Sequence, residues 1–560
     1  MPLKIIRERL ASMEGAWALG AIVVALFMSV PIFAILAAFF AADQGAWRHL
    51  QETLLLQYIF NSTLLMLLTG IIAGALGVGC AWLVAATEFP ARRLVGVMLV
   101  LPLAAPAYIL AYFYSDLLDE SGPVQSWLRS IAFLPAGASI PSIRNLPGAA
   151  VVLGVSLYPY VYLLARRAFE RQAADTFSAA RSLGHGPLSA FWRVALPSAR
   201  PAVAGGLVLV MMETLADFGV ADHFAIPTFS TGIFRSWLLM GDQVSALKLS
   251  GVLLAFIALL VWLEARSRGG REASTRSLRL SVRMPLGPVQ ASLALLACLV
   301  PILIGFVVPV VGFLIMSLKA GDAFLQQSFF DLLGNSLGLA LAVALIACIL
   351  AVFLAYASRL TKSGIVPVFV RLSTLGYALP GALLAIGLLA PLGQADQGVT
   401  RFLAQNFGWS DGLVLTGTLI ALIYACVVRF LTVAYNSVDA GLSMIPSRLE
   451  EAARSLKEKP LGVMRRVHLP LIAPSLGAGG LLVMIDVMRE LPATLILRPF
   501  GFETLSTRIH RLASDERLAD AATACLALLV LGVALVLISL RGDRDRAAPS
   551  EAADPVSGNA

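Results

Sequence analysis

The sequence predicts an all-α integral membrane protein with about twelve transmembrane helices, arranged as two parallel repeats of six helices. Three observations predict this fold. The composition is 58% hydrophobic and 14% charged, with a mean hydropathy of +0.83, whereas about a quarter of the residues in soluble domains are charged. The apolar residues gather in about twelve long runs, and polar landmarks recur in the second half of the chain at a nearly constant offset.

Each apolar run approaches or exceeds the roughly 20 residues that a helix needs to cross the hydrocarbon core. The first run follows a basic N-terminus, as a signal peptide would, but it is too long for one and is interpreted as a retained anchor. The predicted spans are residues 16–41, 60–86, 94–115, 148–168, 201–221, 244–264, 290–317, 333–357, 367–392, 412–435, 472–495 and 520–540.

The distribution of Lys and Arg predicts the orientation, because cytoplasmic loops carry an excess of both residues. With a cytoplasmic N-terminus, the inside segments hold 28 of these residues and the outside segments hold 10. Both termini are therefore expected in the cytoplasm. The net charge of +8 is interpreted as a consequence of this topology. The basic residues are expected to contact membrane lipid, and no nucleic-acid partner is expected.

A basic segment rich in glycine and serine divides the twelve runs into two groups of six. The predicted parts are a first unit over residues 1–266, a cytoplasmic linker over 267–289, a second unit over 290–541 and a disordered cytoplasmic tail over 542–560. All five cysteines lie in apolar runs without a CxxC pair, so they are interpreted as small buried hydrophobic residues.

The two units are predicted to be repeats of each other. Asn61 opens the second run, and Asn335 opens the eighth run 274 positions later. Pro106 and Pro380 have the same offset, and the Ser-Thr pair that begins at Ser230 recurs 276 positions later. Because each unit holds an even number of helices, the repeats are expected to be parallel. The two prolines are expected to kink the third and ninth helices.

Two polar, basic segments interrupt the apolar runs at corresponding places, near residues 170–200 and 443–473. The first polar segment contains Ser-Ala-Ala-Arg-Ser-Leu-Gly from residue 178, and the second contains Glu-Ala-Ala-Arg-Ser-Leu-Lys from residue 451. Each reaches a Leu-Pro pair whose proline lies 19 positions after the first residue of its motif. This layout predicts a short helix on the cytoplasmic membrane surface, presented to a partner. An amphipathic surface helix without a partner is the alternative, which the duplication disfavours.

The two polar segments resemble the EAA loops of ABC-importer permeases with the type I, MetI-like fold. The family pattern is roughly E-A-A-x-x-x-G followed by a late Leu-Pro. The second segment has Lys457 where the family has glycine, and the first has Ser178 where the family has glutamate. The resemblance implies that the segments contact two cytoplasmic ATPase subunits through Ser178, Ala179, Ala180, Gly184, Glu451, Ala452, Ala453 and Lys457.

The same resemblance implies a periplasmic solute-binding protein and a location in the bacterial inner membrane. The chain contains no GxxxxGK[ST] nucleotide-binding motif. The expectation is therefore a translocation subunit that is not an enzyme and that has no cofactor of its own, with ATP and Mg²⁺ bound by the partner subunits.

The fused two-unit form and three further stretches most resemble ferric-iron transport permeases. These stretches are Met-Glu-Thr-Leu-Ala-Asp-Phe-Gly from residue 212, Arg-Glu-Leu-Pro-Ala-Thr-Leu from 489 and Leu-Arg-Pro-Phe-Gly-Phe from 497. Permeases for thiamine, phosphonates or polyamines remain alternatives within the family. A secondary transporter with two six-helix halves would need no ATPase, and a channel or membrane scaffold would not explain the duplicated polar segments.

Glu213, Asp217 and Glu490 are the candidates for the translocation path. They lie near the outer ends of the fifth and eleventh runs, where a carboxylate is costly unless it faces a polar cavity or a partner. Ferric ion prefers such hard oxygen ligands. The alternatives are that Glu490 pairs with the adjacent Arg489, or that the acids lie at the water interface. Asp486 is a lesser candidate.

No tightly bound metal is expected, because a permease must release its cargo. The five histidines are dispersed along the chain and form no spacing typical of metal ligands.

Overall fold

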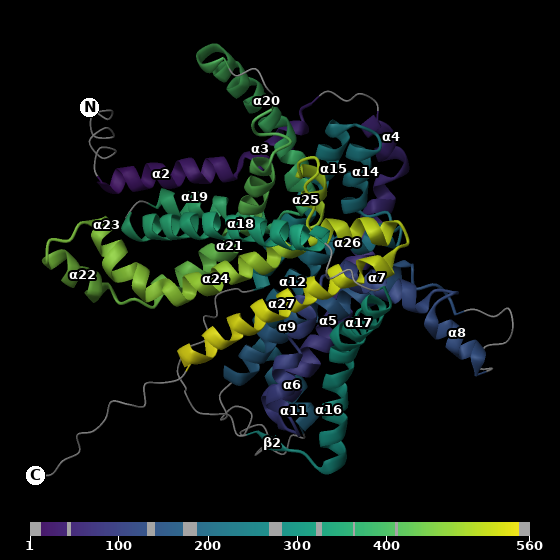
Figure 1. Ribbon diagram of the computed structural model, residues 1–560. Helices are drawn as coiled ribbons and strands as arrows, with labels where there is room; N and C mark the ends of the chain where they lie inside the picture. Colours follow the sequence, from purple (N-terminus) through teal and green to yellow (C-terminus); the bar gives the residue numbers. More distant parts are fainter. Residues whose placement is uncertain are drawn as a thin grey trace, which may run out of the picture.

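The computed structural model describes residues 13–41, 46–131, 140–171, 187–267, 283–320, 327–361, 364–408 and 413–547. Nearly all of these residues are helical (Figure 1). The strands among them are β1 (Thr87–Glu88) and β2 (Met284–Pro285), which pair in parallel. Residues 284 and 285 belong to the predicted linker, so the end of the linker is attached to the loop that follows the second span.

The first repeat contains the helical elements α2 (Met13–Met28), α3 (Val30–Ala38), α4 (Ala46–Thr53), α5 (Leu55–Ala86), α6 (Arg92–Met98), η1 (Leu101–Ala104), α7 (Ala107–Leu118), α8 (Pro123–Ser130), α9 (Leu146–Arg171), α11 (Pro187–Ala190), η2 (Phe191–Ala195), α12 (Leu196–Ala216), α13 (Gly219–His223), α14 (Phe229–Leu238) and α15 (Gln243–Ser267).

The second repeat contains α16 (Pro288–Ile302), η3 (Leu303–Val307), α17 (Val308–Ala320), α18 (Gln327–Leu360), α19 (Ile365–Ser373), η5 (Leu375–Ala378), α20 (Gly381–Phe407), α21 (Leu419–Ser443), α22 (Ser447–Ser455), α23 (Pro460–Val463), η6 (Met464–His468), α24 (Leu469–Arg489), α25 (Pro492–Leu497), α26 (Leu505–Ser514) and α27 (Leu518–Ala547). Helix α27 extends six residues into the predicted disordered tail.

The described residues contain ten helices that are long and apolar enough to cross a membrane, and twelve when two bent pairs each count as one span. The bent pairs are α2 with α3, at 46°, and the segment 92–104 with the segment 107–130, at 89°. The predicted all-α membrane fold with about twelve spans is confirmed.

Proline breaks the third span of each repeat. Pro106 and Pro380 each occupy the N-cap of a helix, α7 and α20, with an extended ψ of 137° and 144°. Each proline follows a short 3₁₀ turn, η1 or η5. A proline has no backbone N–H to continue a helix and excludes α-helical geometry from the residue before it. The predicted kinks are therefore complete breaks.

Equivalent hydrogen bonds confirm the predicted repeat. The side-chain amide of Asn61 donates to the Pro227 carbonyl at 3.0 Å, and that of Asn335 donates to the Glu503 carbonyl at 3.0 Å. The next residue in each case, a serine, accepts the N–H of the residue that begins α14 or α26, at 3.1 and 2.8 Å. Both of these helices begin with a Thr-x-x-Thr capping box. The polar landmarks therefore tie the second span of each repeat to the helix before its last span.

The first span of each repeat packs on the other repeat. Helix α2 contacts α18 and α19, while α16 contacts α5 and α6. The ring of Trp17 stacks on that of Phe353 with centroids 5.1 Å apart, and Gly20 leaves room for the same phenylalanine. This exchange holds the two repeats together.

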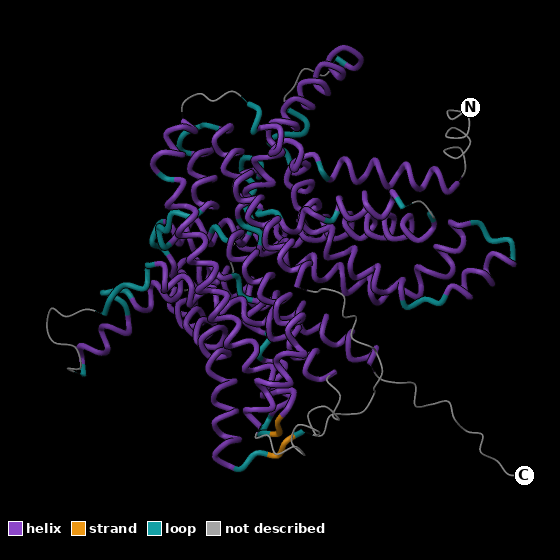
Figure 2. Tube along the Cα trace, turned by 180° about the vertical axis from the view of Figure 1, so that it is seen from behind, coloured by secondary structure: helices purple, strands orange, loops and turns teal. Residues whose placement is uncertain are grey.

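The two repeats separate toward the ends that carry α11 and α22 (Figures 1 and 2). They converge near α7 and α26 (Figure 1). The first predicted polar segment includes α11, and the second includes α22. The described parts of both segments therefore lie on the diverging ends.

Candidate functional site

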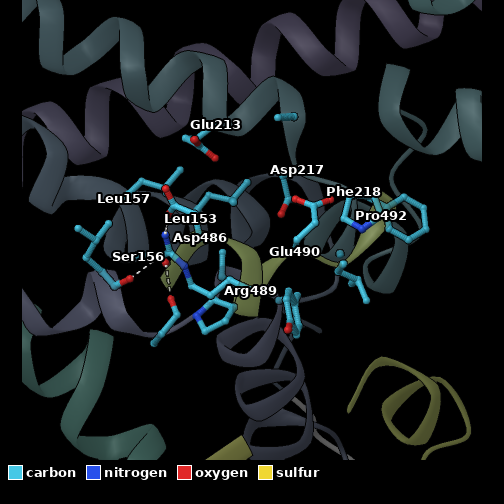
Figure 3. Close-up of a pocket in the computed structure, with 18 of the residues that line it drawn as sticks. Leu153, Ser156, Leu157, Glu213, Asp217, Phe218, Asp486, Arg489, Glu490 and Pro492 are labelled. Carbon is cyan, nitrogen blue, oxygen red and sulfur yellow. Dashed lines mark hydrogen bonds and ion pairs between the residues drawn. The ribbon is translucent and has the colours of Figure 1, made fainter. Parts of the chain in front are cut away.

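A cavity of about 130 Å³ lies where the ends of α12 and α24 meet (Figure 3). It collects ionisable side chains from both repeats in the interior of the bundle. Four carboxylic acids and two arginines line it, namely Glu213, Asp217, Asp486, Glu490, Arg429 and Arg489. All three predicted path residues therefore line one cavity, together with the lesser candidate Asp486.

Helices α12 and α24 end earlier than the predicted spans, which run to residues 221 and 495. Both have 21 residues, and they end at Ala216 and Arg489. The next residue in each case, Asp217 or Glu490, is extended with ψ of 128° or 116°. Each of these residues precedes the N-cap of the short helix that follows, and its carboxylate accepts N–H groups from the first turn of that helix, two for Asp217 and one for Glu490.

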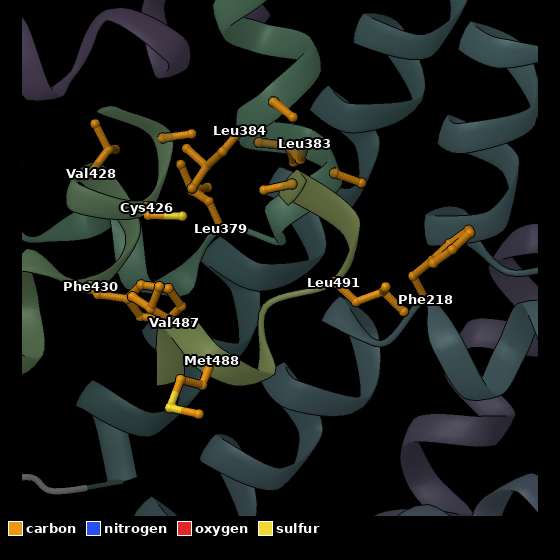
Figure 4. Packing of buried hydrophobic residues seen from close by; sticks show 14 of the residues in the cluster. Phe218, Leu379, Leu383, Leu384, Cys426, Val428, Phe430, Val487, Met488 and Leu491 are labelled. Carbon is orange, nitrogen blue, oxygen red and sulfur yellow. The ribbon is translucent and has the colours of Figure 1, made fainter. Parts of the chain in front are cut away.

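This geometry sets the register between the repeats. Because α12 and α24 have equal lengths, Asp217 corresponds to Glu490 and Glu213 corresponds to Asp486, at an offset of 273. Glu213 and Glu490 belong to corresponding helices, as predicted, but they are not at equivalent positions. The equivalent residues Phe218 and Leu491 both line the cavity, and both belong to the buried hydrophobic packing shown in Figure 4. The cavity thus lies where the two repeats meet.

Glu490 is buried, with 4% of its surface exposed, and it forms an ion pair with Arg429 of α21. Its Oε1 also accepts the N–H of Ala493 at 3.0 Å. Gly381 makes room for the pair, since a Cβ there would overlap Oε1 of Glu490 and lie 2.7 Å from Nη1 of Arg429. A buried carboxylate needs such a partner to offset its desolvation. The alternative in which Glu490 pairs with Arg489 is wrong.

Asp217 has a different environment. Its Oδ2 accepts the N–H groups of Val220 and Ala221 at 3.0 and 3.1 Å. Among the described residues, no basic side chain lies within ion-pair distance of it. Helix α9, the counterpart of α21, carries no charged residue before Arg166. The first repeat therefore offers a carboxylate without a resident cation.

The remaining two acids have polar partners inside the cavity. The hydroxyl of Tyr377 donates to Glu213 at 3.4 Å. Asp486 pairs with Arg489 at 2.5 Å, and Arg489 also donates to the Leu103 carbonyl at 2.5 Å. Both arginines in the cavity are thus engaged by carboxylates, and the cavity keeps an excess of acid.

Arg429 was not recognised as a site residue from sequence. It lies within the tenth apolar run, and a lone basic residue at membrane depth is a signal of a pathway or a buried pair. The described residues contain no group of three or more His, Cys, Asp or Glu side chains arranged to hold a metal ion.

In the first polar segment, residues 172–186 lie outside the described residues, and with them Ser178, Ala179, Ala180 and Gly184. The second contains α22, where Glu451 and Ala452 are exposed and Ala453 is 8% exposed. Lys457 has a φ of +61°. The backbone therefore adopts the left-handed conformation that suits glycine, the family residue at this position.

A partly buried polar cluster anchors α22 to the membrane helices. Glu450 lies 2.5 Å from Nε of Arg359 on α18 and 3.1 Å from Nε2 of His468 in η6. Arg359 also donates to the carbonyls of Leu442 and Ile445. A displacement of α22 would thus be transmitted to α18 and to the start of α24.

Comparison with known proteins gives two matches to one family. The family described as Binding-protein-dependent transport system inner membrane component matches residues 73–265 and, again, residues 349–543. An Fe(3+)-transport system permease protein of Haemophilus influenzae is 26% identical over 486 residues, which cover 85% of this chain and 87% of that protein. A putative ferric transport system permease protein of the same organism is 23% identical over 519 residues, covering 87% of this chain and 77% of that protein.

A relative of about half the length also matches. A sulfate transport system permease protein of Escherichia coli is 25% identical over 248 residues, which cover 43% of this chain and 86% of that protein. The two family matches and this half-length relative agree with two fused units.

Proposed function

This chain belongs to the family of binding-protein-dependent transport system inner membrane components, and on that premise we propose that it is the permease subunit of an ATP-driven importer of ferric iron. The observation that carries the cargo assignment is the acid-rich cavity at the junction of the repeats, in a chain that aligns over most of its length with two ferric permeases. Ferric ion is the cargo and passes through without being retained.

The chemistry of the cavity favours a cation over an oxyanion such as sulfate. Among the described residues, no guanidinium pairs with the Asp217 carboxylate, and the hydrogen-bond partner of Glu213 is a phenol hydroxyl. Both arginines pair with carboxylates, so neither guanidinium is available to bind an anion through two N–H groups. Carboxylate and phenol oxygens suit a hard cation. Because Glu213 and Asp217 belong to the first repeat and Tyr377 to the second, a movement of one repeat against the other would separate these ligands and release the cargo.

ATP hydrolysis takes place on two separate cytoplasmic subunits that contact the two polar segments. Around α22, Met444, Leu449 and Leu456 are 69%, 45% and 80% exposed, next to the exposed Glu451 and Ala452. Exposed apolar side chains on a polar helix suit a partner surface. Closure of the ATPase pair would bring the diverging ends of the repeats together, while their separation would reset the inward-open form.

The outer ends face the periplasm, where a solute-binding protein delivers the cargo, and both termini lie in the cytoplasm. The excess of Lys and Arg on the α11 and α22 side supports this orientation.

The test is uptake of labelled ferric iron and labelled sulfate by cells that lack the chromosomal gene and carry either the intact chain or a variant. Uptake of iron, and not of sulfate, is expected to depend on the chain. Asp217→Asn should reduce iron uptake about tenfold, because a neutral amide no longer attracts the cation. Asp439→Asn is the matched control, since that acid is exposed on α21. Sulfate uptake that depends on the chain, with iron uptake unchanged, would overturn the assignment.

A further inference from the structure

A second cavity, of about 360 Å³, lies at the converging end of the repeats. Its lining includes Tyr112, His223, Asp116, Asp119 and Glu516. One helical turn before Tyr112 on the same helix, Tyr108 lines the carboxylate cavity instead. The two rings have centroids 5.7 Å apart. Helix α7 therefore runs from one acid-rich cavity to the other, and the two tyrosines occupy the boundary between them.

Aromatic rings from both repeats form this boundary. The hydroxyl of Tyr112 and Nδ1 of His510 share a hydrogen bond of 2.7 Å, which joins α7 of the first repeat to α26 of the second. The ring of His223 meets Tyr112 edge-on at 4.6 Å, and Phe218 lies 5.9 Å from His510. We call these five residues, Tyr108, Tyr112, Phe218, His223 and His510, the ring cluster. Both tyrosines and Phe218 are at most 5% exposed, so the cluster blocks passage between the cavities.

The ring cluster leaves polar atoms unsatisfied in this closed arrangement. The hydroxyl of Tyr108 and Nε2 of His223 are buried without a hydrogen-bond partner among the described residues. Such atoms cost free energy in the closed arrangement and would regain hydrogen bonds to water on opening. None of the five residues carries a carboxylate, so no ion pair joins two members of the cluster. Within the cluster, one hydrogen bond and ring packing join the two repeats, and a rocking movement can separate them.

We propose that the ring cluster is the outer gate of the translocation path, and that the cavity lined by Asp116, Asp119 and Glu516 is the vestibule that receives the cation before the gate opens. This inference rests on the proposed transport function. In the present arrangement the gate is closed, while the opposite ends of the repeats diverge (Figure 1). Opening would require Tyr112 to leave His510, and the cation would then pass from one group of acids to the next.

The test measures access to the carboxylate cavity from outside. Ala216, a small residue that lines this cavity, is replaced by cysteine in the full transporter, in sealed right-side-out vesicles without ATP. The rate of labelling by a membrane-impermeant thiol reagent is then measured, with the chain lacking Ala216→Cys as the blank for native cysteines. Adding Tyr112→Ala should accelerate labelling by about tenfold or more. Tyr112→Phe, which keeps the ring and loses the hydrogen bond, should give a smaller increase.

Tyr114→Ala is the matched control. Tyr114 lies on the same helix and donates to the Ile304 carbonyl, but it lines neither cavity. If neither Tyr112→Ala nor Tyr112→Phe changed the labelling rate of the Ala216→Cys chain, the proposed gate would be wrong. The Phe variant keeps the test decisive if the Ala variant fails to reach the membrane. Labelling needs no cargo, so a failure of iron uptake would overturn the proposed cargo and leave the gate standing.

Discussion

Asp217 and Glu490 occupy equivalent positions in the two repeats, but among the described residues only Glu490 has a guanidinium partner. Each follows a 21-residue helix, and its carboxylate accepts backbone N–H from the first turn of the next short helix. Arg429 neutralises Glu490, whereas Asp217 interacts with backbone N–H groups alone. The cavity therefore combines one carboxylate that is held in a buried pair with one that has no basic partner among the described residues. The asymmetry predicts different consequences for substitutions at the two positions.

Removal of Arg429 is expected to destabilise the protein. Arg429→Met leaves Glu490 buried without a partner, which costs about 3–5 kcal/mol. The double variant Arg429→Met/Glu490→Met should recover much of that loss, because no uncompensated charge remains. The measurement is the midpoint of thermal unfolding in detergent. Arg517→Met is the control, since its pair with Asp520 is 62% and 47% exposed and should contribute little. A single variant as stable as the double variant would contradict this account.

Gly381 is expected to tolerate no side chain. The Cβ of Gly381→Ala would overlap the Arg429–Glu490 pair, so either the pair or the start of α20 must shift. The variant should unfold at a lower temperature than the parent and transport more slowly. Gly393 of the same helix has open space around its missing Cβ. Gly393→Ala should therefore be neutral or slightly stabilising, because alanine is the better helix former. Equal effects at both positions would show that crowding of the pair is unimportant.

Glu450 is expected to carry the connection between the ATPases and the membrane helices. Glu450→Ala removes the shared partner of Arg359 and His468, so α22 should lose its fixed position against α18. We expect weaker co-purification of the ATPase subunits and slower transport. Glu458→Ala is the control, because Glu458 pairs with Arg466, which is 75% exposed. Undiminished co-purification and transport with Glu450→Ala would count against a role for this cluster.

The sequence predicts repeated local motifs well, but it does not predict which side chains pair across distant helices. Asn61 and Asn335 revealed the repeat because a motif that occurs twice can be seen without knowing what it contacts. The partner of Glu490 could not be found in this way, since Arg429 lies 61 positions earlier on another helix. The adjacent Arg489 was a poor guide, because the break after α24 sends the two side chains to different partners.

Contacts between the repeats were beyond the reach of sequence for the same reason. Tyr112 and His510 are separated by 398 positions. The histidines looked dispersed along the chain, yet His223 and His510 both contact one tyrosine. Similarly, Lys457 was read as a departure from the family pattern. Its left-handed backbone shows that the conformation suited to glycine is retained.

Lys457→Gly is expected to stabilise the second polar segment. A residue other than glycine in the left-handed region costs about 1 kcal/mol, and glycine adopts it without strain. The expected result is slower proteolysis of the loop after α22 and a small rise in the unfolding midpoint. Lys459→Gly should give no gain, because Lys459 has an ordinary φ of −74°. If both substitutions gave the same change, loss of the lysine charge would be the better explanation.

Acidification is expected to destabilise the converging end of the repeats. Burial and the nearby Arg498 lower the pKa of His510 from its ordinary value of 6.5 to about 4. Burial, together with Arg144 and His510, lowers the pKa of His223 to about 4. Between about pH 6.5 and about pH 4, each of these imidazole rings binds a proton in the unfolded chain but not in the folded chain. Stability should therefore fall as the pH drops from about 6.5 to about 4.

The check is the midpoint of thermal unfolding in detergent at about pH 7, 6 and 5. It is measured for the parent and for the double variant His510→Gln/His223→Gln. The dependence of stability on pH reports the protons taken up on unfolding. Glutamine keeps hydrogen-bonding atoms at both positions and cannot titrate, so the double variant should lose less stability between pH 7 and 5 than the parent. His49→Gln is the matched control, since His49 is exposed on α4. If the unfolding midpoint of the double variant depended on pH as steeply as that of the parent, the acid sensitivity would come from groups other than His223 and His510.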